Sequence, residues 1–522
     1  MVKTFPEGND RPVSIQEPFA AAAPDSPSPS VPRTGDAWFS KPMRIVWVVL
    51  LLYAAGFFCF YPKALTNFDE VYYVRQAAAF SHGSSTVDIT DAYTGAHHRL
   101  HPSDYPPATS AVMTPFVWVA GWRGAFALGL VAIGACVLFT ARWIAASGGS
   151  PLYALFILGY VPALVMARIA MSDVPSACLV AAGLWLFWSD NEPTGWRRFA
   201  AGFLAGVSVC FREPNPILFV FFFAGALLRR ERHLPALVAG GIAGVACRLI
   251  GAALVYGDPL FTKVQFYGFT GLYLAHNLVM YLTGLLILVP GGLILALAYR
   301  GRRRPELVST VAVFVGMFLI YNYNGSASGG LKQWILTLRF MIPLLPIVAF
   351  AMAETCPRWY SALIQRVKPE RRAAWHSITR AAIATWLCGI VIMSFLVNWR
   401  SGLLGQLHQD LIHALYSNTE PSTPLVADIP ASLKFLNELN GQRVAAELTG
   451  ISDNEIGVLL DRHKAIQIVF LDRNDSDYWV LKWKDNQRFL RSLSPKFVTT
   501  LHLERKYPGV GVLQIWNVAK RS

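Results

Sequence analysis

The chain has 522 residues, of which 54% are hydrophobic and only 15% are charged, and its formal net charge is +14 at pH 7. This composition excludes an ordinary soluble enzyme, because the apolar residues gather in blocks long enough to cross a bilayer as helices. A basic chain can also indicate nucleic-acid binding, but here the Lys and Arg clusters flank apolar blocks, as expected for membrane topology. We therefore predict an α-helical polytopic membrane protein that binds no nucleic acid.

The N-terminal residues 1–43 precede the first apolar block and are rich in Pro, Ser, Ala and Gly. A segment of this composition cannot bury enough apolar surface to order itself, so we predict a disordered cytoplasmic tail. The apolar run that starts near Ile45 has no small-residue cleavage site after it. We therefore expect it to stay in the membrane as an anchor.

Residues 44–398 are predicted to form the transmembrane domain, with about 11 spans. Basic clusters fall in alternate loops, which the positive-inside rule assigns to the cytoplasm. The complementary loops, including the long loop 62–110, are predicted to be external. The predicted spans are 44–61, 111–139, 151–169, 175–189, 198–211, 216–229, 235–255, 277–298, 306–322, 338–356 and 379–398.

The last part of the chain, residues 399–522, is predicted to be a small external α/β domain. Short apolar or alternating runs bounded by turn residues indicate strands at 444–448 and 466–471 and a closing hairpin over 497–518. We expect helices at 430–439 and after Ser452, where a glutamate three residues later completes a capping-box pattern.

Two adjacent carboxylates, Asp69 and Glu70, follow the first span. At a membrane surface such a pair can divide its roles, with one carboxylate taking a proton from an attacking hydroxyl while the other orients it or holds a cation. The alternative is structural: Asp69 caps a helix that runs to Phe80, with Glu70 in its first turn. The same loop offers further acceptor-binding or charged candidates at Tyr72, Arg75, His98 and Tyr105.

A third carboxylate, Asp173, lies where one predicted span ends and the next begins. Carboxylates at the edge of the hydrocarbon are costly unless paired or hydrated, so Asp173 is a functional candidate. The alternative is an N-cap ahead of Val174 and Pro175. Arg168 is predicted to partner either Asp173 or a phosphate.

Four isolated basic residues lie in predicted external loops, against the positive-inside trend, and could together surround a phosphate or diphosphate. For Arg212 the alternative is a salt bridge to Glu213, and any one of the four could instead extend its side chain to the membrane interface. The four residues are Arg212, Lys263, Lys332 and Arg339.

A divalent cation is a possible cofactor. His97 and His101, with Asp69 and Asp173, could supply ligands, but the spacing of the histidines does not match a helical metal motif. The seven cysteines show no C-x-x-C spacing and none follows Cys388, so they predict neither a disulfide framework nor a zinc site.

Five stretches, in this order, resemble the GT-C superfamily of membrane glycosyltransferases, especially the bacterial branch related to protein O-mannosyltransferases and aminoarabinose transferases. They are FDEVYYVRQA (68–77), YPPATSAVMTPF (105–116), ARIAMSDVPSA (167–177), YGDPLF (256–261) and RFMIPLLP (339–346). The resemblance implies a GT-C transmembrane domain that uses a sugar carried on a polyprenyl phosphate. The C-terminal region after Arg400 carries no such resemblance.

The resemblance further implies a role for each matched residue. Asp69 matches the catalytic base, with Glu70 beside it, and Asp173 matches the acidic residue of the second external loop. Arg212, Lys332 and Arg339 match phosphate-binding positions less closely. The implied reaction is transfer of the sugar to a hydroxyl on a lipid, polysaccharide or protein acceptor, with inversion, at the external face of the cell inner membrane.

Two other classes of function remain open. A transporter or flippase of a lipid-linked sugar should show internal repeats and ionisable residues near mid-membrane, whereas the polar residues here cluster in loops on one face. A structural or assembly subunit predicts that Asp69 and Asp173 can be replaced without loss of activity.

Overall fold

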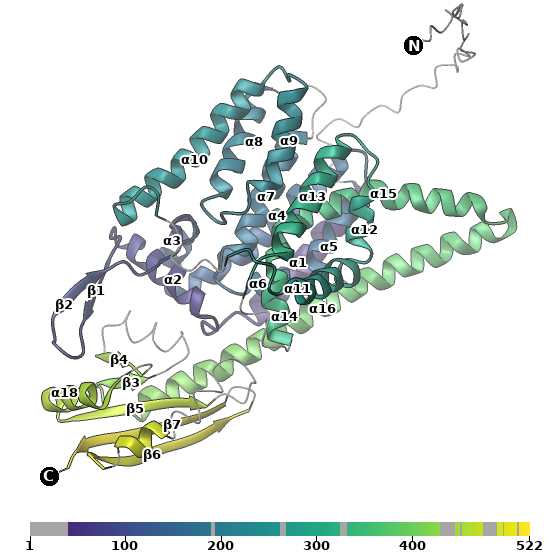
Figure 1. The fold of residues 1–522 in the computed structure, drawn as a ribbon. Helices are drawn as coiled ribbons and strands as arrows, with labels where there is room; N and C mark the ends of the chain where they lie inside the picture. The colour runs from purple at the N-terminus through teal and green to yellow at the C-terminus, as the bar shows by residue number, and fades with distance from the viewer. Residues whose placement is uncertain are drawn as a thin grey trace, which may run out of the picture.

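The computed structural model describes residues 40–188, 194–261, 268–323, 331–427, 444–448, 451–472, 488–493, 495–508 and 511–521. The chain is largely helical, and one five-stranded mixed sheet follows the last long helix (Figure 1). This confirms the predicted fold class, a helical membrane protein with a C-terminal α/β region. The predicted disordered tail lies almost wholly outside the described residues.

Five described segments are long and apolar enough to cross a membrane, so the chain is a multi-pass membrane protein. Three shorter apolar helices, α7 (Asp173–Trp188), α9 (Ile217–Leu228) and α11 (Leu274–Thr283), accompany them. The five segments are α1 (Lys41–Cys59), α3 (Ala108–Ala120) with α4 (Ala125–Ala146), α10 (Leu234–Tyr256), Trp334–Arg366, which ends in α15 (Leu345–Arg366), and α16 (Pro369–Ser417).

Three of the predicted spans are interrupted in the structure. The span 277–298 is broken at 289–291, where Gly291 takes a φ of +68°, between the π-helical turn Gly284–Leu288 that follows α11 and helix α12 (Gly292–Leu297). The span 111–139 divides into α3 and α4 at the 3₁₀ turn Gly121–Gly124, where Gly121 takes a φ of +61° that favours glycine. The span 151–169 becomes the 3₁₀ turn Pro151–Leu155 followed by α5 (Phe156–Gly159) and α6 (Val161–Met166). Proline lacks a backbone N–H and starts helical segments rather than continuing them, so apolar composition alone overstates the helix length here.

The remaining helices complete the bundle: α2 (Phe68–Ser81), α8 (Gly195–Ser208), α12 (Gly292–Leu297), α13 (Arg304–Leu319) and α14 (Leu331–Leu338). Helices α8 and α10 approach closely because glycines face one another. A Cβ at Gly202 or Gly206 would collide with the α10 backbone, and one at Gly240 or Gly244 with that of α8.

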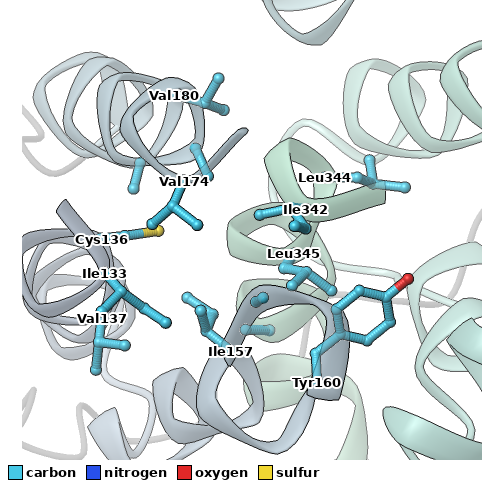
Figure 2. Packing of buried hydrophobic residues seen from close by; sticks show 14 of the residues in the cluster. Ile133, Cys136, Val137, Ile157, Tyr160, Val174, Val180, Ile342, Leu344 and Leu345 are labelled. Carbon is cyan, nitrogen blue, oxygen red and sulfur yellow. The ribbon is translucent and has the colours of Figure 1, made fainter. Parts of the chain in front are cut away.

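The main core joins α4, α5 and α7 to the 3₁₀ turn Arg339–Leu344 and to α15 (Figure 2). Ile342, Leu344 and Leu345 are fully or almost fully buried in it. The phenol of Tyr160 donates a hydrogen bond to the Leu338 carbonyl over 2.9 Å. The turn that carries Arg339 is therefore held by packing and by a buried hydrogen bond.

The C-terminal sheet has the strand order β4-β3-β5-β7-β6. Strands β3 (Leu425–Ala427), β4 (Ala445–Glu447) and β5 (Ala465–Asp472) are parallel, while β7 (Gly511–Lys520) runs antiparallel to both β5 and β6 (Phe497–Tyr507). Side chains of β5 alternate between the two faces of the sheet. Ile466, Ile468 and Phe470 pack with helix α18 (Asp453–His463) on one face, and Val469 packs with the end of α16 on the other. The domain therefore has three layers.

The predicted elements of this domain are confirmed where the structure describes them. The two expected strands are β4 and β5, the closing hairpin is β6–β7, and Ser452 and Glu455 form a reciprocal capping box at the start of α18. The expected helix at 430–439 lies outside the described residues. Helix α16 continues through the predicted domain boundary at 398/399, and its last turns, at Leu411 and Leu415, cover the sheet.

Candidate functional site

The N-terminus of α2 separates the two adjacent carboxylates. Asn67, not Asp69, caps this helix: its side chain accepts from the Asp69 N–H over 3.2 Å, and Glu70 completes the capping box. The N-cap role considered as the structural alternative for Asp69 is therefore filled by Asn67. Asp69 and Glu70 lie in the first turn, where the helix dipole favours negative charge.

The carboxylate of Glu70 is fully buried and lies against backbone N–H groups. Its Oε2 accepts from the N–H groups of Thr66 and Asn67 over 2.7 and 2.8 Å, and its Oε1 from the N–H of Ala170 over 2.9 Å. Burial raises the pKa of Glu70 to about 7, while these N–H donors act in the opposite direction. Glu70 thus joins the start of α2 to the loop that precedes α7.

The carboxylate of Asp69 points to a different set of groups and is 23% exposed. Its Oδ1 accepts from the Tyr105 hydroxyl over 2.7 Å, and its Oδ2 lies 3.7 Å from Arg339 Nη1. Burial and the nearby Asp69 charge raise the pKa of Tyr105, so its phenol stays a proton donor. Among the described residues, one carboxylate oxygen of Asp69 accepts a close hydrogen bond and the other has a long charge contact.

A second ion pair lies beside the first. Asp173, at the start of α7, pairs with Arg212, and the Asp173 side chain is only 2% exposed. The guanidinium carbons of Arg212 and Arg339 lie 5.1 and 5.4 Å from the centre of the same Phe340 ring. Burial raises the pKa of the Tyr73 phenol, with the charges of Asp69 and Asp173 adding to the effect.

The site thus holds two carboxylates and two guanidiniums around one aromatic ring, with no net charge. Arg339 is almost buried, and its Nε has no hydrogen-bond partner within the described part of the chain. A guanidinium in this state can donate hydrogen bonds to a phosphate oxygen without first losing a strong partner. The partly exposed Asp69 can take a proton from a bound hydroxyl.

Several predicted site residues lie elsewhere. Arg168 donates to the Asn398 side chain and the Phe60 carbonyl, so it joins α1 to α16. The place beside Asp173 that was predicted for Arg168 is taken by Arg212. Glu213, considered as the partner of Arg212, lies 3.8 Å from Arg248. Lys263 lies outside the described residues. Lys332 is the second residue of α14, and the structure does not describe its side chain.

The remaining candidates flank the site. Tyr72 lies with its ring 6.0 Å from that of Tyr105, and Arg75 is buried farther along α2. His97 and His98 are exposed on strand β2 (His97–Leu100), and the His101 ring meets the edge of Tyr256. Over the described ranges, no group of three or more His, Cys, Asp or Glu side chains gathers to hold a metal ion.

Three hydrogen bonds at the site involve side chains that the sequence did not mark as candidate site residues, although each lies in a stretch that carries the resemblance. The Tyr256 hydroxyl donates to the Tyr105 carbonyl and accepts from Gln76 Nε2 over 2.8 Å, and Tyr73 donates to Ser172 over 3.4 Å. A helical reading of 68–81 could have found part of this set, because Asp69, Tyr73 and Gln76 recur at spacings of four and three on one face. Tyr256 opens the stretch YGDPLF, but nothing in that stretch predicts its contacts with Tyr105 and Gln76.

Two crystal structures of ArnT from Cupriavidus metallidurans resemble the chain over nearly its whole length. One is in the apo state and one is bound to undecaprenyl phosphate; they are 16% and 15% identical to this chain. Each aligns with a TM-score of 0.54 over 92% of this chain and 98% of its own. The chain has the fold of this ArnT.

An Archaeoglobus fulgidus oligosaccharyltransferase is more distant, with 11% identity and a TM-score of 0.45 over 83% of this chain and 70% of its own. No protein-family model and no curated protein sequence matches the chain.

Proposed function

We propose that this protein is a glycosyltransferase that moves a sugar from a polyprenyl-phosphate donor to an acceptor hydroxyl. The observation that carries this proposal is the partly exposed Asp69 carboxylate, held between the Tyr105 hydroxyl and Arg339 and beside the Asp173–Arg212 pair. The ArnT fold supports it, because one ArnT structure holds undecaprenyl phosphate. Carboxylate and guanidinium are the groups that this transfer needs side by side.

The proposed reaction is one direct displacement. Asp69 takes the proton of the acceptor hydroxyl while the acceptor oxygen bonds to the anomeric carbon. The bond from that carbon to the phosphate oxygen breaks, and the polyprenyl phosphate leaves with the electron pair. Arg339 and Arg212 stabilise the charge that builds on the phosphate, so no acid needs to protonate it, and a single attack inverts the configuration.

The two other carboxylates have supporting roles in this proposal. Glu70 positions Asp69, because its contacts with Thr66, Asn67 and Ala170 set the first turn of α2. Asp173 holds Arg212 and keeps the site neutral until the phosphate arrives. No step needs a divalent cation, and transfer should persist after treatment with a chelator.

The predicted topology belongs to the same proposal. Helix α2, which carries Asp69 in its first turn, lies at one end of the bundle with the hairpin of strands β1 (Val87–Thr90) and β2 and the C-terminal sheet (Figure 1). We place this end outside the inner membrane and the N-terminus in the cytoplasm, in keeping with the basic loops. Residues 44–398 would be the catalytic domain and 399–522 the periplasmic domain, joined by the continuous helix α16.

The deciding experiment measures transfer of radiolabelled sugars from a panel of polyprenyl-phosphate donors, in membranes that contain equal amounts of wild type or Asp69→Asn. Asp88→Asn is the matched control, because Asp88 is an exposed carboxylate in the same loop that pairs only with exposed Arg99. Loss of transfer in Asp69→Asn alone supports the proposal. Normal transfer by Asp69→Asn, or none by the wild type from any donor, overturns it in favour of a transporter.

A further inference from the structure

A β-hairpin connects the candidate site to the C-terminal domain. It consists of β1 (Val87–Thr90) and β2 and lies between α2 and the Tyr105 loop. Its tip enters the apolar layer that α18 forms with the sheet: Ala92 is only 5% exposed there, and Tyr93 packs beside it. Although it is far from α18 in sequence, the tip is therefore part of the core of the C-terminal domain.

Two polar contacts fix the tip to the end of α18. Arg462 Nη1 donates to the Tyr93 carbonyl over 3.4 Å, and His463 Nε2 lies 3.3 Å from the Ala92 carbonyl oxygen. Both acceptors are backbone atoms, so these contacts hold the path of the chain. They lie at the C-terminus of α18, where the helix dipole favours basic side chains.

The tip itself has a fixed shape. Asp91 Oδ1 accepts from the N–H groups of Tyr93 and Thr94 over 2.8 and 2.7 Å, and Gly95 takes a φ of +69°. Gly95 lies directly against Arg462, and a side chain there would collide with the guanidinium. The turn and the end of α18 therefore fit each other closely.

The same segment continues directly into the site. After β2, the His101 ring contacts the edge of Tyr256 at a centroid distance of 5.4 Å, and the Tyr256 hydroxyl donates to the Tyr105 carbonyl. Tyr105 then donates to Asp69. One short segment is thus held by the C-terminal domain at one end and bonded to the proposed base at the other.

We propose that the C-terminal domain positions the general base through this hairpin, with Arg462 and His463 as the positioning residues. This inference rests on the proposed transfer function. Without the docked tip, residues 82–107 would form a long connection free to sample many paths, and the Tyr105–Asp69 bond would be made only part of the time. Because catalysis depends on held geometry, a displacement of about 1 Å at such a site can lower the rate by as much as about a hundredfold.

The test compares paired substitutions in the full-length enzyme. Arg462→Ala with His463→Leu should lower kcat for sugar transfer about tenfold and leave KM for the lipid donor unchanged, because the arginines of the site are intact. Arg462→Lys with His463→Gln keeps a donor at each position and should restore most of the rate. Lys496→Ala, which breaks an ion pair with Asp453 at the other end of α18, is the matched control and should leave kcat unchanged.

A second variant approaches the contact from the hairpin, so that the C-terminal domain keeps its own sequence. Gly95→Val should displace the tip, because a β-branched residue strains a turn that needs a φ of +69°, and its side chain should also push the Arg462 guanidinium away from the Tyr93 carbonyl. Amide hydrogen exchange over 86–101 should rise in Gly95→Val and in the double variant. Asp69→Asn should abolish transfer without changing that exchange.

The outcomes separate this inference from the proposed function. If Asp69→Asn is inactive but both hairpin variants keep the wild-type kcat despite faster exchange, the positioning role is overturned and the glycosyltransferase proposal stands. If the wild type transfers no sugar, both are overturned. If the hairpin variants raise KM for the donor at constant kcat, the hairpin acts on donor binding and the positioning of the base is refuted.

Discussion

The molecule holds two clusters of arginines and carboxylates, and they differ in how fully the carboxylates are bonded. At the turn between α9 and α10, at the top of Figure 1, Glu231 accepts from Arg198 through one oxygen and from Arg303 through the other, each over 2.6 Å. At the site, Asp69 has one 2.7 Å bond and one 3.7 Å charge contact. The two side chains are similarly exposed, 18% for Glu231 and 23% for Asp69, so the difference lies in their bonding. A carboxylate whose two oxygens both accept close hydrogen bonds is suited to a structural role, whereas an oxygen held by a 3.7 Å charge contact can still accept a proton.

The surrounding arginines repeat this contrast. Arg198 and Arg303 are both nearly buried and lie over the same Phe187 ring, and both are held by Glu231. Arg212 and Arg339 also share a ring, that of Phe340, but only Arg212 has a close carboxylate partner. The same chemical groups therefore serve folding at one end of the bundle and are available for a ligand at the other.

The largest expected effect is at the structural cluster. Glu231→Gln should lower the stability of the folded protein by about 3–5 kcal/mol, because two nearly buried guanidiniums lose their shared counter-charge. Apparent melting temperature in detergent measures this loss. The protein that remains folded should keep its wild-type kcat, and a reduced kcat per folded molecule would mean that the two clusters are coupled.

Glu70 extends the comparison, since both of its carboxylate oxygens accept close hydrogen bonds and it is the neighbour of the proposed base, Asp69. Its pKa is raised from 4.5 to about 7, so the folded state binds the proton more tightly than the unfolded state does. The resulting stabilisation, about 3 kcal/mol, is fully present below pH 4.5 and is lost as the pH rises through about 7. The stability of the wild type relative to Glu70→Gln should therefore fall between pH 4.5 and 8.

Melting curves of both proteins across this pH range provide the measurement. Glu70→Gln keeps the size of the side chain but cannot ionise, so it reports the contributions of all other titrating groups. A difference that grows with pH instead would show that the three N–H donors outweigh burial and hold Glu70 ionised.

Sequence reasoning located the candidate site because its residues stand out chemically. Carboxylates and arginines next to apolar blocks are rare and costly, so Asp69, Asp173, Arg212 and Arg339 could be selected from composition and position alone. Their mutual contacts join segments far apart in the chain and could not be read from spacing. This is why the sequence predicts Arg168 as a partner of either Asp173 or a phosphate, whereas the structure pairs Asp173 with Arg212.

For the fold, too, the sequence predicted individual elements better than their lengths and their contacts. Period-two alternation identified the strands of the C-terminal domain, and the capping box identified the start of α18. Helix lengths were harder, because prolines and positive-φ glycines break apolar blocks that read as continuous, as at Gly121. The docking of Ala92 and Tyr93 on α18 had no local signal, since a single alanine and tyrosine in a turn resemble any exposed loop.

Replacing Arg339, which has the longer carboxylate contact of the two site arginines, tests the proposed role of the site cluster. Arg339→Gln should lower transfer about a hundredfold, because an arginine that stabilises charge on the leaving phosphate acts most strongly in the transition state. Steady-state kinetics with the lipid donor measure the effect. Arg303→Gln, at the other cluster, should lower the melting temperature with little change in kcat, and the reverse pattern for the two variants would contradict the assignment of the clusters.

The smallest expected effect comes from the hydrogen bond that orients the base. Tyr105→Phe removes the 2.7 Å bond to Asp69 Oδ1 but keeps the ring, which packs 4.7 Å from that of Tyr73. The carboxylate then has no close hydrogen-bond partner among the described residues and loses its fixed orientation, so kcat should fall about tenfold, about 1.4 kcal/mol in the barrier. Because the donor phosphate is held by other groups, KM for the donor should not change.

Tyr72→Phe is the control, since the Tyr72 ring lies against Tyr105 at 6.0 Å and its change leaves the Tyr105–Asp69 bond in place. Equal losses in both variants would show that the fall in kcat does not come from the Tyr105–Asp69 hydrogen bond.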